Sequence, residues 1–221
     1  ANTSLVTLSH ASNVTGVTQE VESIVKVARE REALSLLDAS QSIGQIAVSQ
    51  YESIADIVVS PGHKWLMGMH GIAVLYARQG IHFDPLIQGG TGSTSESLEM
   101  PVEMQDQVEV GTIDFPAAAA LLAGCRWLKE ERLESVAAAC KGYAQACYDE
   151  LCDIRGVRVI TPDPTSGVLG PPIISMVCDG YSPVEVAALF EQIAGVQVRS
   201  GYHCAAPVSY THLRAHETFG Y

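Results

Sequence analysis

The chain has 221 residues, 47% of them apolar, which is enough to bury a substantial core. Thirteen basic against 25 acidic residues give a net charge of −12, which argues against nucleic acid or an anionic membrane surface as partner, because both require basic patches. The six cysteines form no CxxC pair and no metal-ligand spacing with histidine, which predicts free thiols in a reducing, cytoplasmic compartment without a metal site.

Short apolar runs in the first half of the chain predict strands of a buried sheet. The first run is followed by an amphipathic helix with its apolar stripe at Val21, Ile24, Val25 and Ala28, capped by Thr18. No apolar run is long enough to span a bilayer, and no signal peptide opens the chain. The expected strands are 5–8, 34–37, 54–59 and 71–76.

Two residues that follow these runs suggest the chemistry. Asp38 ends the second run, where open α/β sheets bind their ligands. Lys64 follows the third run, and a desolvated lysine there could form a Schiff base with a carbonyl cofactor, although a solvated loop lysine is the alternative. A pyridoxal phosphate enzyme needs this pair, an acid for the ring nitrogen and a lysine for the aldehyde. Twenty-six residues separate them, enough for the chain to return to the same sheet edge.

The second half of the chain changes character. Residues 81–107 have little periodicity and predict a long active-site loop near a subunit boundary. Two helices follow, and then a strand, strand, helix, strand order typical of a small α+β domain, with a boundary near residue 130. The expected elements are helices at 116–128 and 133–153, strands at 157–161, 172–178 and 196–199, and a helix opened by the capping box at 182–185.

The last strand leads to Cys204. Its neighbours His203 and Arg199 favour a thiolate, although an inert surface cysteine is the alternative.

Six segments in order resemble the class V aminotransferase family, pyridoxal phosphate enzymes of fold type I, and among them the cysteine desulfurases. The segments are 9–16, 37–41, 60–64, 89–93, 109–112 and 198–205. The resemblance implies an α/β fold with a partial large domain at 1–130, whose sheet is mixed and mostly parallel, and a small α+β carboxyl-terminal domain at 131–207. Residues 208–221 abandon the family pattern and are interpreted as a non-native tail.

The resemblance also assigns roles to individual residues. Lys64 would carry pyridoxal 5'-phosphate, and the Cys204 thiolate would attack the substrate sulfur. Thr112 would reach the phosphate of a neighbouring subunit in a homodimer. The remaining contacts implied are Asp38 at the ring nitrogen, Gln41 at the ring hydroxyl, Asn13 at the ring hydroxyl or the substrate, and Ser60 and His63 at the phosphate.

The implied reaction is conversion of L-cysteine to L-alanine with a persulfide on Cys204, which a sulfur-acceptor protein could relieve. Alternatives that keep the cofactor are a selenocysteine lyase, an aminotransferase or an epimerase. Another is an inactive fragment or scaffold, since the family's amino-terminal phosphate loop, ring-stacking histidine and substrate-carboxylate arginine are not identified in this chain. We therefore expect weak or absent activity from these 221 residues alone.

Overall fold

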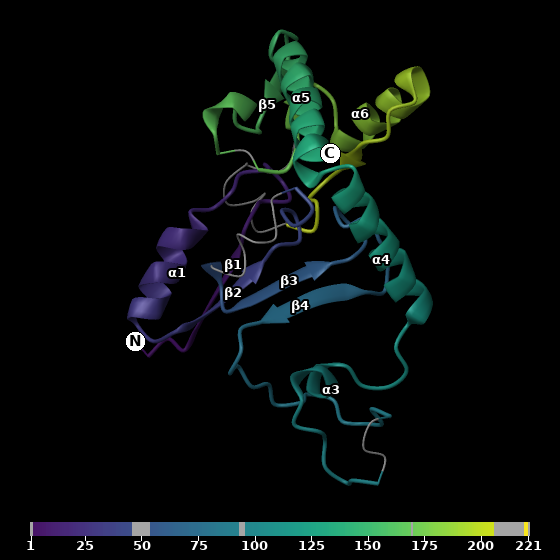
Figure 1. The fold of residues 1–221 in the computed structure, drawn as a ribbon. Helices are drawn as coiled ribbons and strands as arrows, with labels where there is room; N and C mark the ends of the chain where they lie inside the picture. Colours follow the sequence, from purple (N-terminus) through teal and green to yellow (C-terminus); the bar gives the residue numbers. More distant parts are fainter. Residues whose placement is uncertain (1, 46–53, 93–95, 169, 206–218, 221) are drawn as a thin grey trace.

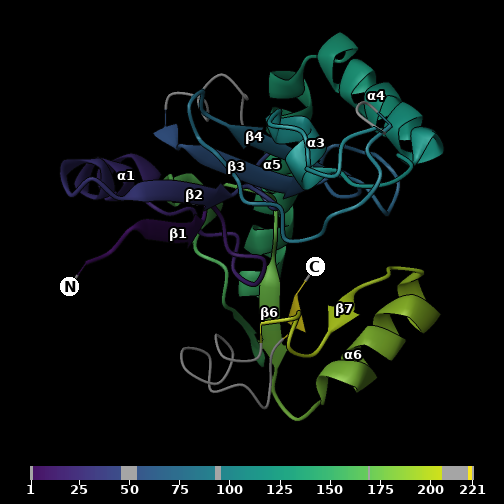
Figure 2. The same cartoon turned by 90° about the horizontal axis from the view of Figure 1, so that it is seen from below.

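Two four-stranded sheets organise the protein. Figures 1 and 2 show strands β1 to β4 side by side in the first sheet. The structure is a computed structural model that describes residues 2–45, 54–92, 96–168, 170–205 and 219–220. Within this part of the chain, no helix is both long and apolar enough to cross a membrane. All six cysteines are free, as expected.

The first sheet confirms the predicted mixed, mostly parallel α/β architecture. Its order is β1-β2-β3-β4, with the first three strands parallel and β4 antiparallel to β3. The strands are β1 (Leu5–Ser9), β2 (Leu34–Asp38), β3 (Ile57–Pro61) and β4 (Ala73–Ala77). Because Ser9 pairs with Asp38 and Asp38 with Val59, the carboxyl ends of the three parallel strands meet at one edge of the sheet.

The boundaries of β3 differ from the expected strand at 54–59. The strand starts at Ile57, and the backbone N–H of Asp56 before it donates to the hydroxyl of Ser35 at 3.0 Å. It extends to Pro61, which pairs with Ala73 of β4. Proline has no backbone N–H with which to continue the ladder, so the strand ends there.

The helix after β1 begins later than expected. Helix α1 spans Val21–Glu30, with Glu20 at the N-cap and no side-chain cap. The expected cap at Thr18 is wrong, since its backbone N–H and its hydroxyl both donate to the carbonyl of Val168, at 2.8 and 2.9 Å. Thr18 therefore joins the two halves of the chain, a long-range contact that helix-capping patterns do not indicate.

The long loop after β4 leads into two consecutive helices. Its described residues include the short helix α3 (Met104–Val108), and in Figure 1 the loop lies on the opposite side of the sheet from α5 (Leu133–Cys152) and α6 (Pro183–Leu189). Helix α4 (Phe115–Glu130) starts at an Asp114 cap, and α5 spans Leu133–Cys152. Helix α5 buries Ala144 and Leu151, whereas Tyr143 is 77% exposed.

The second sheet is antiparallel, in the order β5-β6-β8-β7. Its helix α6 has the predicted capping box, in which Ser182 accepts from the backbone of Glu185 and the Glu185 carboxylate accepts from Ser182. Of the tail at 208–221, residues 208–218 and 221 lie outside the described residues, and the remaining two form β8. The elements are β5 (Val157–Val159), η2 (Pro164–Ser166), β6 (Ser175–Cys178), α6 (Pro183–Leu189), η3 (Phe190–Ala194), β7 (Arg199–Ser200) and β8 (Phe219–Gly220).

Candidate active site

Asp38 lies at the carboxyl edge of the first sheet, with its carboxylate fixed by the backbone. It ends β2 and is half-buried, and its Oδ1 accepts a hydrogen bond of 2.9 Å from the N–H of Ser40. Its own carbonyl accepts from the N–H of His10, also at 2.9 Å. The segment that follows β1 is therefore tied directly to the end of β2.

Lys64 lies at the same edge, in the turn that joins β3 to β4. The turn is closed by backbone hydrogen bonds from Met67 to the carbonyl of Lys64, at 3.0 Å, and from Gly68 to that of Gly62, at 2.8 Å. The expectation of a desolvated amine is wrong for the described residues, because Lys64 is exposed.

The Lys64 turn is packed tightly against two neighbouring segments. A Cβ at Gly44 or at Gly124 of α4 would overlap the backbone carbonyl of Trp65 or of Leu66. Trp65 also donates from its indole Nε1 to Oε1 of Gln41, at 3.2 Å. Gln41 thus reaches the residue next to Lys64, and its amide NH₂ is left as a donor.

The packing role of Gly124 was missed in the sequence. A glycine inside a helix costs stability relative to alanine and often marks a close approach of two backbones. Its position in the alanine-rich run of 117–124 was the available signal.

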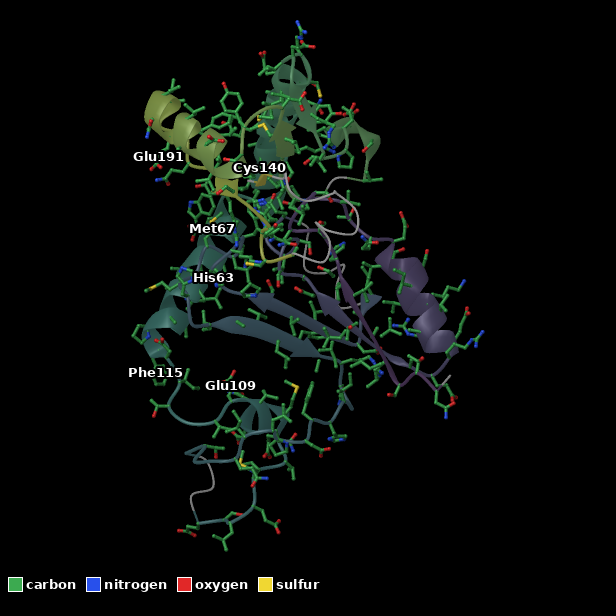
Figure 3. All side chains as sticks on the ribbon, turned by 180° about the vertical axis from the view of Figure 1, so that it is seen from behind. His63, Met67, Glu109, Phe115, Cys140 and Glu191 are labelled. Atoms are coloured by element: carbon green, nitrogen blue, oxygen red, sulfur yellow. The ribbon has the colours of Figure 1, made fainter. Side chains whose placement is uncertain are left out.

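The candidate phosphate contacts are less closely gathered. Ser60 is buried at the end of β3, 3.4 Å from the carbonyl of Pro61. His63 is exposed, and its ring lies 4.5 Å from that of His70. Thr112 is exposed in the long loop, where Gly111 donates to Gly90. Figure 3 shows His63 at the end of the sheet next to α4, whereas Glu109, close to Thr112 in sequence, lies below the sheet.

Asn13 and the Cys204 turn come together although 190 residues separate Asn13 from His203. The amide Nδ2 of Asn13 donates to the backbone carbonyl of His203 at 2.6 Å. The exposed Cys204 follows directly, and its Sγ accepts from Nη2 of Arg199 at 2.9 Å. The segment after β1 therefore contacts both the end of β2 and the turn that carries the thiol.

Two histidines near this junction are held towards the neutral form. His203 is only 4% exposed, and its Nε2 is buried without a hydrogen-bond partner among the described residues. Burial, and then the positive charge of Arg199, lower the pKa of His203. Burial also lowers the pKa of His10. A neutral imidazole avoids placing a second positive charge beside the Arg199 guanidinium.

Asp38, Lys64 and Gln41 thus place an acid, an amine and an amide at one edge of the sheet. Asn13 connects this edge to the turn that carries the Cys204 thiol. These groups suit the binding and deprotonation of an amine substrate followed by attack of a thiolate. Among the described residues, no group of three or more His, Cys, Asp or Glu side chains could hold a metal ion.

Comparison with known proteins gives a consistent result. The family model described as aminotransferase class-V matches residues 1–219. A probable cysteine desulfurase from Methanothermobacter thermautotrophicus is 31% identical over 99% of this chain, and one from Pyrococcus abyssi is 32% identical over 92%. The aligned regions are 54% and 51% of those two relatives, so the chain spans about half of their length.

Solved structures agree with the sequence relatives. The apo cysteine desulfurase of Thermococcus onnurineus superposes with a TM-score of 0.82 at 30% identity, over 98% of this chain and 54% of the other. A cysteine desulfurase from Escherichia coli superposes with a TM-score of 0.87 over 98% of this chain and 53% of the other. At 20% identity the second match supports the shared fold alone.

Proposed function

The chain belongs to the class V aminotransferase family, and from this premise we propose that it is part of a pyridoxal phosphate-dependent cysteine desulfurase. The proposed reaction converts L-cysteine to L-alanine and leaves a persulfide on Cys204. The observation that carries the proposal is the hydrogen bond from Asn13 to His203, because it links the thiol-bearing turn to the segment that also binds the end of β2 beside Asp38.

The residues present fit the cofactor. The carboxylate of Asp38 is already oriented by Ser40 and suits a protonated ring nitrogen. The exposed amine of Lys64 is open to an aldehyde. Asn13 and Gln41 each keep an amide N–H beyond the hydrogen bonds described above, so both could donate to a ring hydroxyl. The residues proposed for the phosphate are Ser60, His63 and, from a second subunit, Thr112.

Bound pyridoxal phosphate would supply an electron-accepting ring that stabilises negative charge at the substrate carbon. Lys64 would remove the substrate α-proton and return a proton to carbon, and Asp38 would keep the ring nitrogen protonated. The Cys204 thiolate would attack the sulfur of L-cysteine. The new sulfur–sulfur bond forms as the carbon–sulfur bond breaks, and the carbon takes the electron pair and then a proton to give alanine. No external oxidant or reductant is required.

Purified protein with added pyridoxal phosphate, L-cysteine and a thiol reductant that releases the persulfide sulfur tests this function, with alanine and sulfide as the measured products. The gene encoding the whole polypeptide is the better source, because the chain spans about half of its relatives. Lys64→Ala should abolish the lysine-linked absorbance of the cofactor, whereas Cys204→Ser should retain the absorbance and lose sulfide release. Full desulfurase turnover in Cys204→Ser would contradict the proposed sulfur acceptor.

The same assay separates the alternatives. Alanine formed only from selenocysteine would indicate a selenocysteine lyase, and amino-group transfer or racemisation without sulfide would indicate an aminotransferase or an epimerase. Absence of the lysine-linked absorbance in the whole polypeptide would favour an inactive scaffold. We place the active protein in the cytoplasm, where its free thiols would stay reduced and a sulfur-acceptor protein could take the persulfide.

We also propose that the protein is a homodimer and that the long loop after β4 lies at the interface. Leu86 and Leu98 in this loop are 101% and 104% exposed, and Phe115 at the start of α4 is 70% exposed. Exposed apolar side chains gathered in one segment are typical of protein–protein contacts. Light scattering on the whole polypeptide, with Leu86→Asp and Leu98→Asp, tests this: the double variant should be monomeric.

The domain boundary near residue 130 is part of the proposal. Two separate apolar clusters support it, one including Leu37, Val58 and Leu128, and the other including Ala144 and Met176. Limited proteolysis within 129–134 that releases two protease-resistant fragments would support the division.

A further inference from the structure

We propose that Asn13 is a positioning residue that holds the turn of residues 202–205 so that the Cys204 sulfur lies against the Arg199 guanidinium. The inference deepens the proposed function, because Cys204 is the proposed sulfur acceptor. Its test nevertheless reads the thiol alone, without cofactor or turnover, so either idea can fail without the other.

The turn that carries Cys204 has an unfavourable backbone. It is closed by a hydrogen bond of 2.8 Å from the N–H of Ala205 to the carbonyl of Tyr202. Both central residues have positive φ, 51° at His203 and 60° at Cys204. Two such values in succession characterise a type I′ turn, which favours asparagine, aspartate and glycine because other side chains clash with the backbone. This turn therefore needs support from outside itself.

Asn13 supplies that support at the first central residue. Its amide donates to the carbonyl of His203 at 2.6 Å, while the His203 side chain is buried. His203 is thus held through both its backbone and its ring. The Asn13 bond fixes the peptide group between His203 and Cys204, because the accepting carbonyl belongs to that group.

Asn13 can serve as an anchor because its own segment is fixed. Val14 is fully buried, and its carbonyl accepts a hydrogen bond from the hydroxyl of Ser175. The carbonyl of Gly16 accepts from Gly170 at 3.1 Å, in addition to the two bonds from Thr18 to Val168. These contacts attach the Asn13 segment to 168–175, independently of the Cys204 turn.

The consequence for the thiol is electrostatic. Arg199 lies in β7, five residues before Cys204, and its Nη2 is 2.9 Å from Sγ. If the peptide between His203 and Cys204 rotated, the sulfur would leave the guanidinium, because Cys204 follows directly from the peptide group whose carbonyl Asn13 binds. A positive charge beside the sulfur attracts anionic reagents, and at contact distance in water one charge pair contributes about 1 kcal/mol, or roughly fivefold in rate.

Alkylation with two matched reagents tests the proposal. Iodoacetate is anionic and iodoacetamide is neutral and of similar size, so their rate ratio at Cys204 reports the local charge, while accessibility and thiolate fraction cancel. The rates are measured on the 221-residue chain by mass spectrometry of the Cys204 peptide. The half-buried Cys178 in the same digest is the internal reference.

We expect Asn13→Leu, which has a similar shape and no N–H donor, to lower the ratio at Cys204 about threefold, close to the effect of Arg199→Gln. The double variant should show no further decrease, because Asn13 acts through Arg199. Gln19→Leu, the same chemical change at an exposed site of the same segment, should keep the wild-type ratio.

A wild-type ratio in Asn13→Leu, or a further decrease when it is added to Arg199→Gln, overturns the proposal. So does a wild-type ratio in Arg199→Gln. If Asn13→Leu unfolds the chain, seen as fast alkylation of Cys178, then Asn13→Ala, which adds no bulk, takes its place with the same expected outcomes.

Discussion

The two ends of the first sheet differ in how their polar groups are satisfied. At the amino end of β3, the buried carboxylate of Asp56 accepts three hydrogen bonds, two from Ser35 and one from Arg78, at 2.8–2.9 Å. At the carboxyl end, Lys64 is exposed, and the Nε2 of buried His203 has no partner among the described residues.

The amino end of this sheet therefore contributes to stability, whereas its carboxyl end carries the groups proposed for the chemistry. The Asp56 cluster, defined as Asp56, Ser35 and Arg78, joins β2, β3 and the end of β4 and leaves no carboxylate oxygen for a ligand. The carboxyl edge keeps its acid, amine and amides able to bind something else. Unsatisfied and strained groups of this kind gather at functional sites.

The largest effect should come from the Asp56 cluster. Asp56→Ala should lower the free energy of unfolding by about 2–4 kcal/mol, because the buried Ser35 donors lose their acceptor. The Arg78 side chain, 54% exposed, can return to water. Urea unfolding measures the effect. Asp38→Ala is the matched control: it removes an acid with a single side-chain hydrogen bond and should cost about 1 kcal/mol. Equal losses of unfolding free energy in the two variants would contradict the proposed difference between the two ends of the sheet.

The same cluster predicts acid sensitivity. Burial alone raises the pKa of Asp56, but the hydrogen bonds from Arg78 and Ser35 and the charge of Arg78 outweigh it, so its pKa lies below the ordinary value of 3.8. This carboxylate therefore contributes stability above pH 3.8, and the contribution is lost as the pH falls through the lower pKa of the folded state. In urea unfolding measured at a series of pH values, Asp56→Asn should reduce the loss of unfolding free energy below pH 3.8.

The packing that holds the Lys64 turn should have an intermediate effect. Gly124→Ala places a Cβ against the carbonyl of Leu66, and the overlap should cost about 1–3 kcal/mol in spite of alanine's better helix propensity. Gly142→Ala in α5 is the control, because a Cβ there meets nothing within 4 Å, and it should stabilise the protein by about 0.5–1 kcal/mol. Thermal unfolding of both variants measures the difference in stability between them. Equal stabilities would show that the Lys64 turn can move away from the added Cβ.

His203, in the strained turn that carries Cys204, should have a smaller and pH-dependent effect on the free energy of unfolding. The pKa of His203 is lowered below its usual 6.5, so as the pH falls below 6.5 the unfolded chain takes up a proton more readily than the folded one. Stability is therefore fully present above pH 6.5 and decreases as the pH falls through the folded-state pKa. His203→Gln should remove part of this decrease, with the rest belonging to His10. An unchanged slope between pH 7 and 5 would show that His203 is not held neutral.

The smallest effect on stability should come from the residue most important for the proposed chemistry. Lys64→Met should change the free energy of unfolding by no more than about 0.5 kcal/mol, because the side chain is exposed. The same variant should lose all lysine-linked cofactor absorbance in the whole polypeptide. A large loss of stability would mean that Lys64 is a structural residue.

Much of the first sheet could be predicted from the sequence. Alternating or continuous apolar runs identified all four strands to within three residues, and the order of Asp38 and Lys64 after two of them indicated a shared edge. The errors concern residues whose partners are distant. Thr18 was interpreted as a helix cap, and Lys64 as desolvated, because local patterns cannot say which segment lies against them.

By itself, the sequence determined the family, the mixed sheet and the identity of the chemical groups, since these follow from residue types and their spacing along the chain. Only the tertiary structure decided that Asn13 contacts the Cys204 turn, that Gly124 lets α4 approach the Lys64 turn, and that Asp56 rather than Asp38 is the buried acid. The contact between Asn13 and His203, 190 residues apart, depends on how distant segments pack together. Local sequence periodicity does not determine which distant segments meet.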